Sequence, residues 1–266
     1  MKKEHDYETL MYVVLVAGFL IRAFFSYTKS IYHDEAMYLA LGFFAGLNPF
    51  YFLYTADYTA FWGGTIFSSL LPLVIDRISY SLISTGFGLR IAKVIAGVCS
   101  IYIVYKICKK TGNEKAGLIA SFFLALNSTN VFSDFLKYEV YKTLFVLLGA
   151  YFLIDKGKNS RYYSAICFFL SILMKYSAVV PVISILGVSF FADKKLRKKI
   201  IPTGFLLAVL CATFFMWHLN QVDVLGRTSE VYKSMKESPF DTVGTTITGF
   251  LFFFAVLLIS FKKIKH

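Results

Sequence analysis

Long apolar runs, separated by short charged clusters, make up most of the chain. Eight runs approach the length of a membrane-crossing helix, since about 20 apolar residues span a hydrocarbon core about 30 Å thick. They lie at residues 9–27, 88–107, 114–131, 138–154, 161–173, 176–192, 200–218 and 243–261. The fifth and sixth runs are short and meet at Met174 and Lys175, which predicts a short or partly re-entrant hairpin. The pattern predicts an all-α, polytopic membrane bundle of about eight transmembrane helices.

Lysine and arginine gather in the segments between alternate runs. If the runs cross in strict alternation, five clusters share one side: residues 2–3, 106–115, 156–161, 194–199 and 262–265. Cytoplasmic loops are enriched in these residues, so this side is predicted to be cytoplasmic. We therefore expect a multi-pass protein of the plasma membrane with both termini in the cytoplasm.

The stretch from Trp62 to Gly86 does not fit this alternation. It is apolar enough to span a membrane, but it contains Pro72 and the adjacent charges Asp76 and Arg77. Counting it as a further span would place the basic cluster at 106–115 on the outer side. It is therefore predicted as a helix lying in the outer interface, within the first outer loop.

The composition agrees with a membrane protein. Hydrophobic residues make up 57% of the 266 positions and the mean hydropathy is +0.63, which a soluble domain would hardly show. The net charge of +12 follows the loop clusters, so it indicates topology and not nucleic-acid binding. Four cysteines without CxxC spacing are interpreted as small core residues. No repeat or soluble segment marks a boundary, so residues 1–266 are expected to form a single membrane domain.

Several charged residues are predicted at the outer ends of the runs. A carboxylate there can act as a general base toward a hydroxyl group, and Arg or Lys can bind phosphate. The acids are Asp34, Glu35, Asp57, Asp134 and Glu139, and the bases are Arg90, Lys137, Lys142 and Lys175. Interfacial charges that reach into water are the alternative for any single lysine. For Asp34 and Glu35 the alternative is capping the helix predicted in "AMYLALGFFAGL".

Four motifs, in order, carry a resemblance to a known family. They are "HDEAMYLALGFFAGLNPF", "SLLPLVID", "GFGLRIAKVIAGVCSIYIVYKICKKTGNEKAGLIASFFLALNS" and "FFLSILMKYSAVVP". Together they resemble the amino-terminal module of GT-C glycosyltransferases, in particular the protein O-mannosyltransferase and aminoarabinose-transferase-like group. The resemblance covers about residues 8–195, which leaves 196–266 for two further spans and an outer loop. In this short form, acceptor recognition is expected from that loop or from a partner subunit.

The resemblance implies roles for particular residues. Asp34 would be the catalytic base, and Glu35 would orient Asp34 or the acceptor. Arg90 and Lys175 would bind the donor phosphate, with Lys137 as a weaker candidate. The candidate second acids are Asp57 and Glu139.

The resemblance also implies the reaction and its partners. A sugar would move from a polyprenyl-phosphate-linked donor to a lipid, glycan or protein acceptor at the outer membrane face. No cofactor is expected; a divalent cation is conceivable, but no metal-ligand spacing supports one. Two other classes stay open: a non-catalytic subunit that binds lipid-linked glycans, and a small-molecule transporter. The transporter is disfavoured because the later spans carry few acids and no paired inverted repeats.

Overall fold

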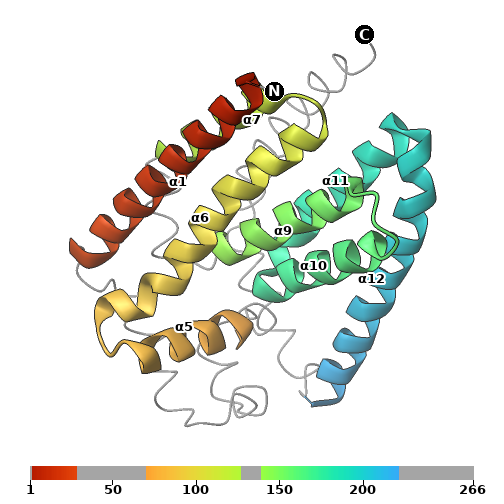
Figure 1. Ribbon diagram of the computed structural model, residues 1–266. Helices are drawn as coiled ribbons and strands as arrows, with labels where there is room; N and C mark the ends of the chain where they lie inside the picture. Colours follow the sequence, from red (N-terminus) through yellow and green to blue (C-terminus); the bar gives the residue numbers. More distant parts are fainter. Residues whose placement is uncertain (1, 29–69, 127–138, 222–266) are drawn as a thin grey trace, which may run out of the picture.

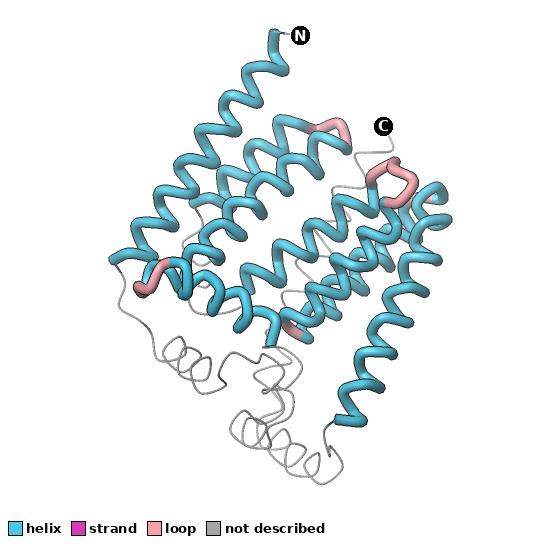
Figure 2. The backbone as a smooth tube through the Cα atoms, turned by 60° about the horizontal axis from the view of Figure 1, so that its bottom comes forward, coloured by secondary structure: helices cyan, strands magenta, loops and turns pink. Residues whose placement is uncertain are grey.

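The computed structural model describes residues 2–28, 70–126 and 139–221 of the chain. Within these ranges the protein is entirely helical and contains no strand (Figure 1). The fold class predicted from the apolar runs is therefore confirmed as all-α for the described residues. Figure 2 shows the helices as a bundle whose short connections lie at two opposite ends.

Helices begin and end close to the predicted run boundaries. Their bounds are α1 Lys2–Thr28, α5 Leu70–Leu82, α6 Gly86–Lys110, α7 Glu114–Leu126, α9 Glu139–Ile154, α10 Ser160–Met174, η2 Tyr176–Ala178, α11 Val179–Ala192 and α12 Lys194–Gln221. The turn between α6 and α7 is made by Gly112, whose φ of 82° favours glycine because side chains with a Cβ rarely adopt it. The break between α10 and α11 falls at Lys175 and η2, where the sequence predicted a hairpin tip.

Chain direction alternates through the bundle, which defines its two ends. At one end α1, α7 and α10 stop and α6, α9 and α11 begin; we call it the Arg90 end. At the opposite end α6 is joined to α7, α9 to α10 and α11 to α12; we call it the basic end (Figures 1 and 2). The clusters at 106–115, 156–161 and 194–199 all lie at the basic end, as the alternation predicted.

The prediction of about eight transmembrane helices is not confirmed. By length and composition, two helical segments among the described residues could cross a membrane: Asp6–Thr28 and Gly86–Lys110. Helices α10 and α11 are apolar but have only 15 and 14 residues, which at 1.5 Å per residue reach roughly 20 Å. The eighth predicted run, at 243–261, lies outside the described residues.

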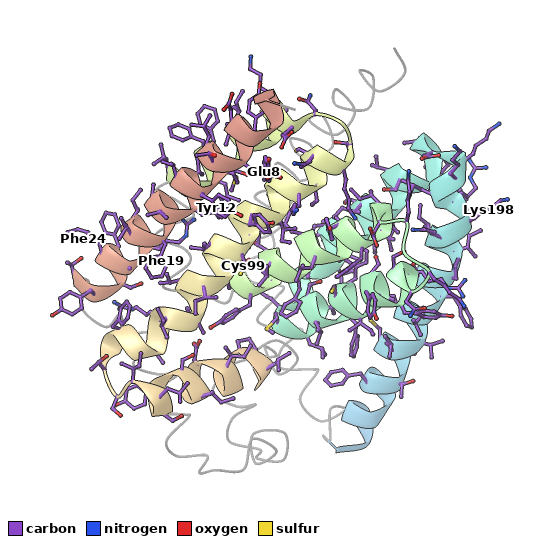
Figure 3. All side chains as sticks on the ribbon, in the orientation of Figure 1. Glu8, Tyr12, Phe19, Phe24, Cys99 and Lys198 are labelled. Atoms are coloured by element: carbon purple, nitrogen blue, oxygen red, sulfur yellow. The ribbon has the colours of Figure 1, made fainter. Side chains whose placement is uncertain are left out.

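Apolar side chains nevertheless cover much of the outer surface. On α1, Tyr12, Phe19 and Phe24 are exposed and point away from the bundle (Figure 3). Further exposed apolar residues lie on α7, α11 and α12, among them Phe123, Phe191 and Phe205. So many exposed apolar side chains indicate contact with a membrane or a partner, and the two long apolar helices favour a membrane.

Helix α5 occupies the stretch for which the sequence predicted an interfacial helix. Its 13 residues are too few to cross a bilayer, and it packs against α6 and α10 at the Arg90 end. Gly88 permits the tight approach between α5 and α6, because a Cβ there would lie 1.7 Å from the backbone oxygen of Ile83. The placement of α5 in a membrane interface stays a prediction.

The four cysteines do not all lie in the core. Cys167 is buried, Cys108 and Cys211 are half-buried, and Cys99 is exposed on α6 (Figure 3). The core prediction is therefore wrong for Cys99, because an apolar run fixes the helix but not which side of it faces the bundle. All four are free thiols.

Candidate functional site

Three of the predicted site residues lie in the described part of the chain: Arg90, Glu139 and Lys175. All three belong to the Arg90 end, at the start of α6, the start of α9 and the end of α10. The remaining four, Asp34, Glu35, Asp57 and Lys137, lie outside the described residues. Their roles are neither confirmed nor contradicted.

Glu139 and Lys175 are brought together as an ion pair between α9 and α10. Lys142, one turn along α9, pairs with the other carboxylate oxygen of Glu139, so one carboxylate holds two ammonium groups. The Nζ atom of Lys142 also donates to Ser177 Oγ at 3.3 Å. All three charged side chains are roughly a fifth to a third exposed. The cluster carries net positive charge and remains open to solvent on one side.

Lys175 is held in place by its backbone. It follows the last turn of α10 in an extended conformation, and its N–H donates to Ser171 O at 3.1 Å. Its carbonyl accepts from Ala178 N at 2.9 Å, which starts the short η2 turn. The sequence "MKYSA" thus ends one helix and begins the next with the lysine at the junction.

Arg90 lies in the interior of the bundle, with only 1% of the residue exposed. Its Nη1 atom donates to Ser26 O, in the last turn of α1, at 2.8 Å. A cation is stabilised at this position because the final carbonyls of a helix lack intrahelical partners and carry partial negative charge. Arg90 therefore has a structural role in joining α1 to α6, whether or not it also binds a phosphate.

Arg22 makes the same kind of contact with another helix. It is buried to 1% exposure, and its guanidinium donates to Leu124 O and Ala125 O, at the C-terminal end of α7, at 3.3 and 3.2 Å. It also reaches Gly18 O on α1 at 3.3 Å. The arginine thus binds the end of α7 to the middle of α1.

A buried ion pair joins α5, α6 and α9. Lys93 Nζ lies 2.8 Å from Asp76 Oδ2, and Tyr141 donates its hydroxyl to Asp76 Oδ1 at 2.7 Å. The side chains of Lys93 and Asp76 are only 2% and 4% exposed. The Asp76 carboxylate thus accepts from two donors, and the added hydrogen bond helps to offset the cost of removing both charges from water. An ion pair without such a hydrogen bond would not offset this cost.

The sequence reasoning did not predict Arg22, Lys93 or Asp76 as residues of the site. Arg22 and Lys93 each interrupt an otherwise apolar run, a signal that points to buried and partnered charge. In the sequence, Asp76 was interpreted as a sign of an interfacial helix, and its pairing with Lys93 was not predicted. Their pairing depends on how α5 lies against α6 and α9, which periodicity along the chain does not encode.

Cationic groups outnumber carboxylates at the Arg90 end of the described chain. The cations are Arg22, Arg90, Lys93, Lys142 and Lys175, and the carboxylates are Asp76 and Glu139. These charges are buried or half-buried, where electrostatic interactions are stronger than in water. An anion such as a phosphate group would be attracted to this end. Among the described residues, no group of three or more His, Cys, Asp or Glu is placed to hold a metal ion.

Comparison with known proteins identifies the family. The model of the dolichyl-phosphate-mannose-protein mannosyltransferase family matches residues 68–217, more than half of the chain, and the chain belongs to this family. Membership indicates a membrane glycosyltransferase of the GT-C type, which confirms the resemblance seen in the motifs at that level but no narrower branch. No curated protein and no solved structure matches the chain.

The matched region includes most of the described site, but not Arg22 and not the acidic motif of the first loop. Arg90, Lys137, Glu139 and Lys175 lie within it, as does the pair of Asp76 and Lys93. The motif "HDEA" at 33–36 lies before its first residue. The family assignment therefore rests on the helices from α5 to α12.

Proposed function

We propose that this protein transfers a sugar from a polyprenyl-phosphate-linked donor to an acceptor at the outer face of a plasma membrane. The observation that carries the proposal is the family match over 68–217, within which a cluster of buried and half-buried cations gathers at one end of apolar helices. The excess of lysine and arginine at the other end favours a cytoplasmic position for the basic end. The Arg90 end would then face outward.

The donor phosphate would bind among the cations of the Arg90 end. Lys175 is our first candidate because it is partly exposed at a helix junction, and Lys142 beside it adds a second ammonium group. Lys137 is a further candidate, and so is Arg90, whose guanidinium adds positive charge at the same end while it holds Ser26. Positive charge there stabilises the negative charge that develops on the departing phosphate.

Asp34 is proposed as the general base, with Glu35 orienting it. The acceptor hydroxyl attacks the anomeric carbon and gives its proton to Asp34, while the bond from that carbon to the phosphate oxygen breaks. The electron pair of that bond leaves with the lipid phosphate, which needs no added proton to depart. Asp57 stays a candidate second acid. Glu139 is less suited to that role, because its carboxylate is already paired with two lysines.

The test is a transfer assay with purified protein and a panel of radiolabelled polyprenyl-phosphate sugars, using native membrane extract as acceptor. Asp34→Asn keeps the shape of the side chain and removes its basicity, so transfer should fall by at least about a hundredfold. Asp155→Asn, the same change at the basic end, is the matched control and should leave transfer near the parent rate. Equal activity of parent and Asp34→Asn would refute the assignment of the base.

A second variant separates donor binding from catalysis. Lys175→Ala should raise the donor KM by about tenfold with a smaller change in kcat, because it removes a charge that contacts the phosphate in both ground and transition states. If a donor binds equally to parent and Asp34→Asn but neither transfers the sugar, the chain is a non-catalytic subunit that binds lipid-linked glycans. The transporter alternative finds no support in the described helices, where the buried charges lie within about two turns of the Arg90 end.

A further inference from the structure

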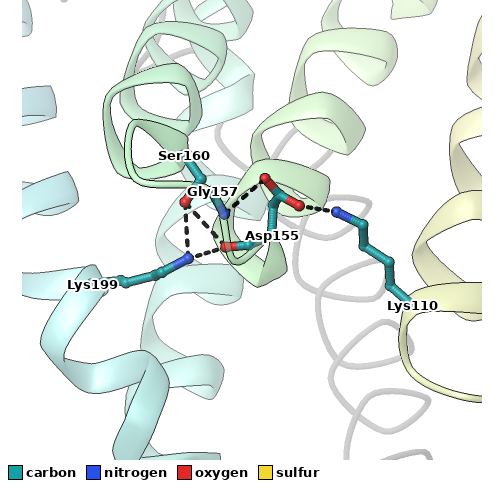
Figure 4. A network of polar contacts seen from close by, with 5 residues as sticks. All are labelled: Lys110, Asp155, Gly157, Ser160 and Lys199. Carbon is teal, nitrogen blue, oxygen red and sulfur yellow. Dashed lines mark hydrogen bonds and ion pairs between the residues drawn. The ribbon is translucent and has the colours of Figure 1, made fainter.

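Three acidic residues of the basic end are already engaged in ion pairs. Asp155 pairs with Lys110 through its carboxylate (Figure 4). On the neighbouring helices, Glu8 and Glu114 both lie within 3 Å of Lys109 Nζ, at 2.8 and 2.9 Å. These three carboxylates are therefore occupied by Lys109 and Lys110 and do not pair with the other cations at this end.

Among the exposed lysines that form no ion pair within the described part of the chain, five lie in the connection between α9 and α10 and at the start of α12. They are Lys156, Lys158, Lys194, Lys195 and Lys198, which we call the lysine platform. Lys156 and Lys158 lie in the connection between α9 and α10, and the other three lie in the first two turns of α12. Lys198 projects away from the bundle in Figure 3.

The three platform lysines on α12 lie at the unfavourable end of their helix. The amino end of a helix carries partial positive charge, so cations there are destabilising by a few tenths of a kcal/mol each. The acid next to them in the chain is Asp193, whose Oδ1 accepts from the backbone N–H of Lys195 at 2.7 Å. That contact caps the helix, and within the described residues no ion pair joins Asp193 to the platform lysines.

The platform is fixed in position by the network in Figure 4. Lys199 donates to the carbonyl of Asp155 and to Ser160 Oγ, the latter at 2.9 Å. Ser160 Oγ in turn donates to Asp155 O at 3.1 Å, and Gly157 N donates to Asp155 Oδ2 at 3.2 Å. The start of α12 is thereby tied to the connection between α9 and α10, so the two groups of lysines belong to one surface.

Exposed apolar side chains border this surface on the helix side. Phe191, three residues before Lys194, is 82% exposed, and Ile201, three residues after Lys198, is 62% exposed. Tyr162 and Tyr163 are 44% and 50% exposed in the first turn of α10. Cations beside a belt of aromatic and aliphatic residues are arranged as the boundary between lipid headgroups and acyl chains requires. A nucleic acid or an acidic soluble protein would match the charge but not the apolar border.

We propose that the lysine platform binds the phosphodiester headgroups of anionic membrane lipids. The headgroup phosphates would supply the counter-charge that the engaged carboxylates cannot, while the acyl chains lie along the exposed side chains of α10 to α12. The site is at the opposite end of the bundle from the proposed sugar-transfer site. Its occupancy would therefore stabilise the fold without taking part in the reaction.

The proposal is tested by thermal unfolding of the full chain in a neutral detergent. Short-chain phosphatidylglycerol should raise the melting temperature, and short-chain phosphatidylcholine at the same concentration should not. Lys194→Gln/Lys195→Gln/Lys198→Gln should raise the phosphatidylglycerol concentration needed for half of this shift roughly a hundredfold, because each lysine contributes about fivefold. The response should also weaken as salt is raised.

Matched variants distinguish a lipid site from a simple anion site and from a loss of folding. Lys194→Arg/Lys195→Arg/Lys198→Arg keeps the charge and should keep the response. The pair Lys156→Gln/Lys158→Gln gives an independent test should the triple variant fold poorly, and it should weaken the response by about twentyfold. The proposal is overturned if the glutamine variants respond like the parent, or if phosphatidylcholine is as effective. Inorganic phosphate producing the same shift would show a simple anion site, and it would also overturn the proposal.

Discussion

The two ends of this bundle hold charge in opposite ways. At the Arg90 end, charged groups such as Arg22, Arg90 and Lys93 are buried and bound to backbone carbonyls or to Asp76. At the basic end, the charges are mostly exposed, and even the ion pair of Lys110 with Asp155 is about a third exposed. A buried charge needs a partner, and its electrostatic interaction with that partner is strong because little water screens it. An ion pair exposed to water contributes little to the free energy of folding. The comparison predicts that equivalent substitutions at the two ends will have very unequal effects.

The largest effect is expected from Asp76→Asn. It leaves the ammonium group of Lys93 in the bundle without its carboxylate, and breaking a buried pair typically costs about 3–5 kcal/mol. Asp155→Asn removes a carboxylate from the basic end and should cost under about 1 kcal/mol. The two variants should be compared by denaturant unfolding of the protein in detergent micelles. Equal losses of stability would contradict the contrast between the ends.

A double variant sharpens this first prediction. Asp76→Asn/Lys93→Met removes both charges, so it should recover at least about half of the stability lost in Asp76→Asn alone. Failure to recover would mean that Asp76 acts chiefly through Tyr141 and not through the ion pair.

A smaller effect is expected from the two glycines that shape the connections at each end. Gly88→Ala would bring a Cβ against the Ile83 carbonyl and force α5 away from α6, at a cost of about 1–3 kcal/mol. Gly112→Ala meets no neighbouring atom, so its cost is the left-handed backbone alone, about 1 kcal/mol. Thermal unfolding of both variants checks the order. A greater loss for Gly112→Ala would show that packing of α5 is not tight.

The smallest effect concerns pH at the basic end. The hydrogen bond from Lys110 holds the pKa of the Asp155 carboxyl below its usual value. A lowered pKa in the folded state means that the contact stabilises the protein above the unfolded pKa, near 4, and that this stability is lost as pH falls through the folded pKa. The free energies of unfolding of the parent and of Asp155→Asn should differ by under about 1 kcal/mol at about pH 5. This difference should shrink as the pH is lowered further. A difference that grows on acidification would contradict the assigned sign.

The site was predictable from the sequence to an uneven degree. Lys175 and Glu139 are both identifiable because each stands at the edge of an apolar run, and the structure pairs them. Arg90 is identifiable as a phosphate-binding candidate, yet its neighbours in the sequence give no hint that it holds the end of α1. Lys93 was missed although it interrupts an apolar run. A charge inside an apolar helix indicates that a partner exists, but the sequence does not show which residue that partner is.

The sequence by itself determined the helical class, the alternating order of the runs and the gathering of lysine at one end, because each depends only on composition along a short window. The number of membrane crossings was not determined in this way: α7, α9, α10 and α11 have only 13 to 16 residues, and their lengths depend on where each chain segment turns. Only the tertiary structure decided that Asp76 lies beside Lys93 and that Lys199 joins Asp155 and Ser160. Such contacts connect residues on different helices, and their formation depends on how those helices pack and not on the order of residues along any one of them.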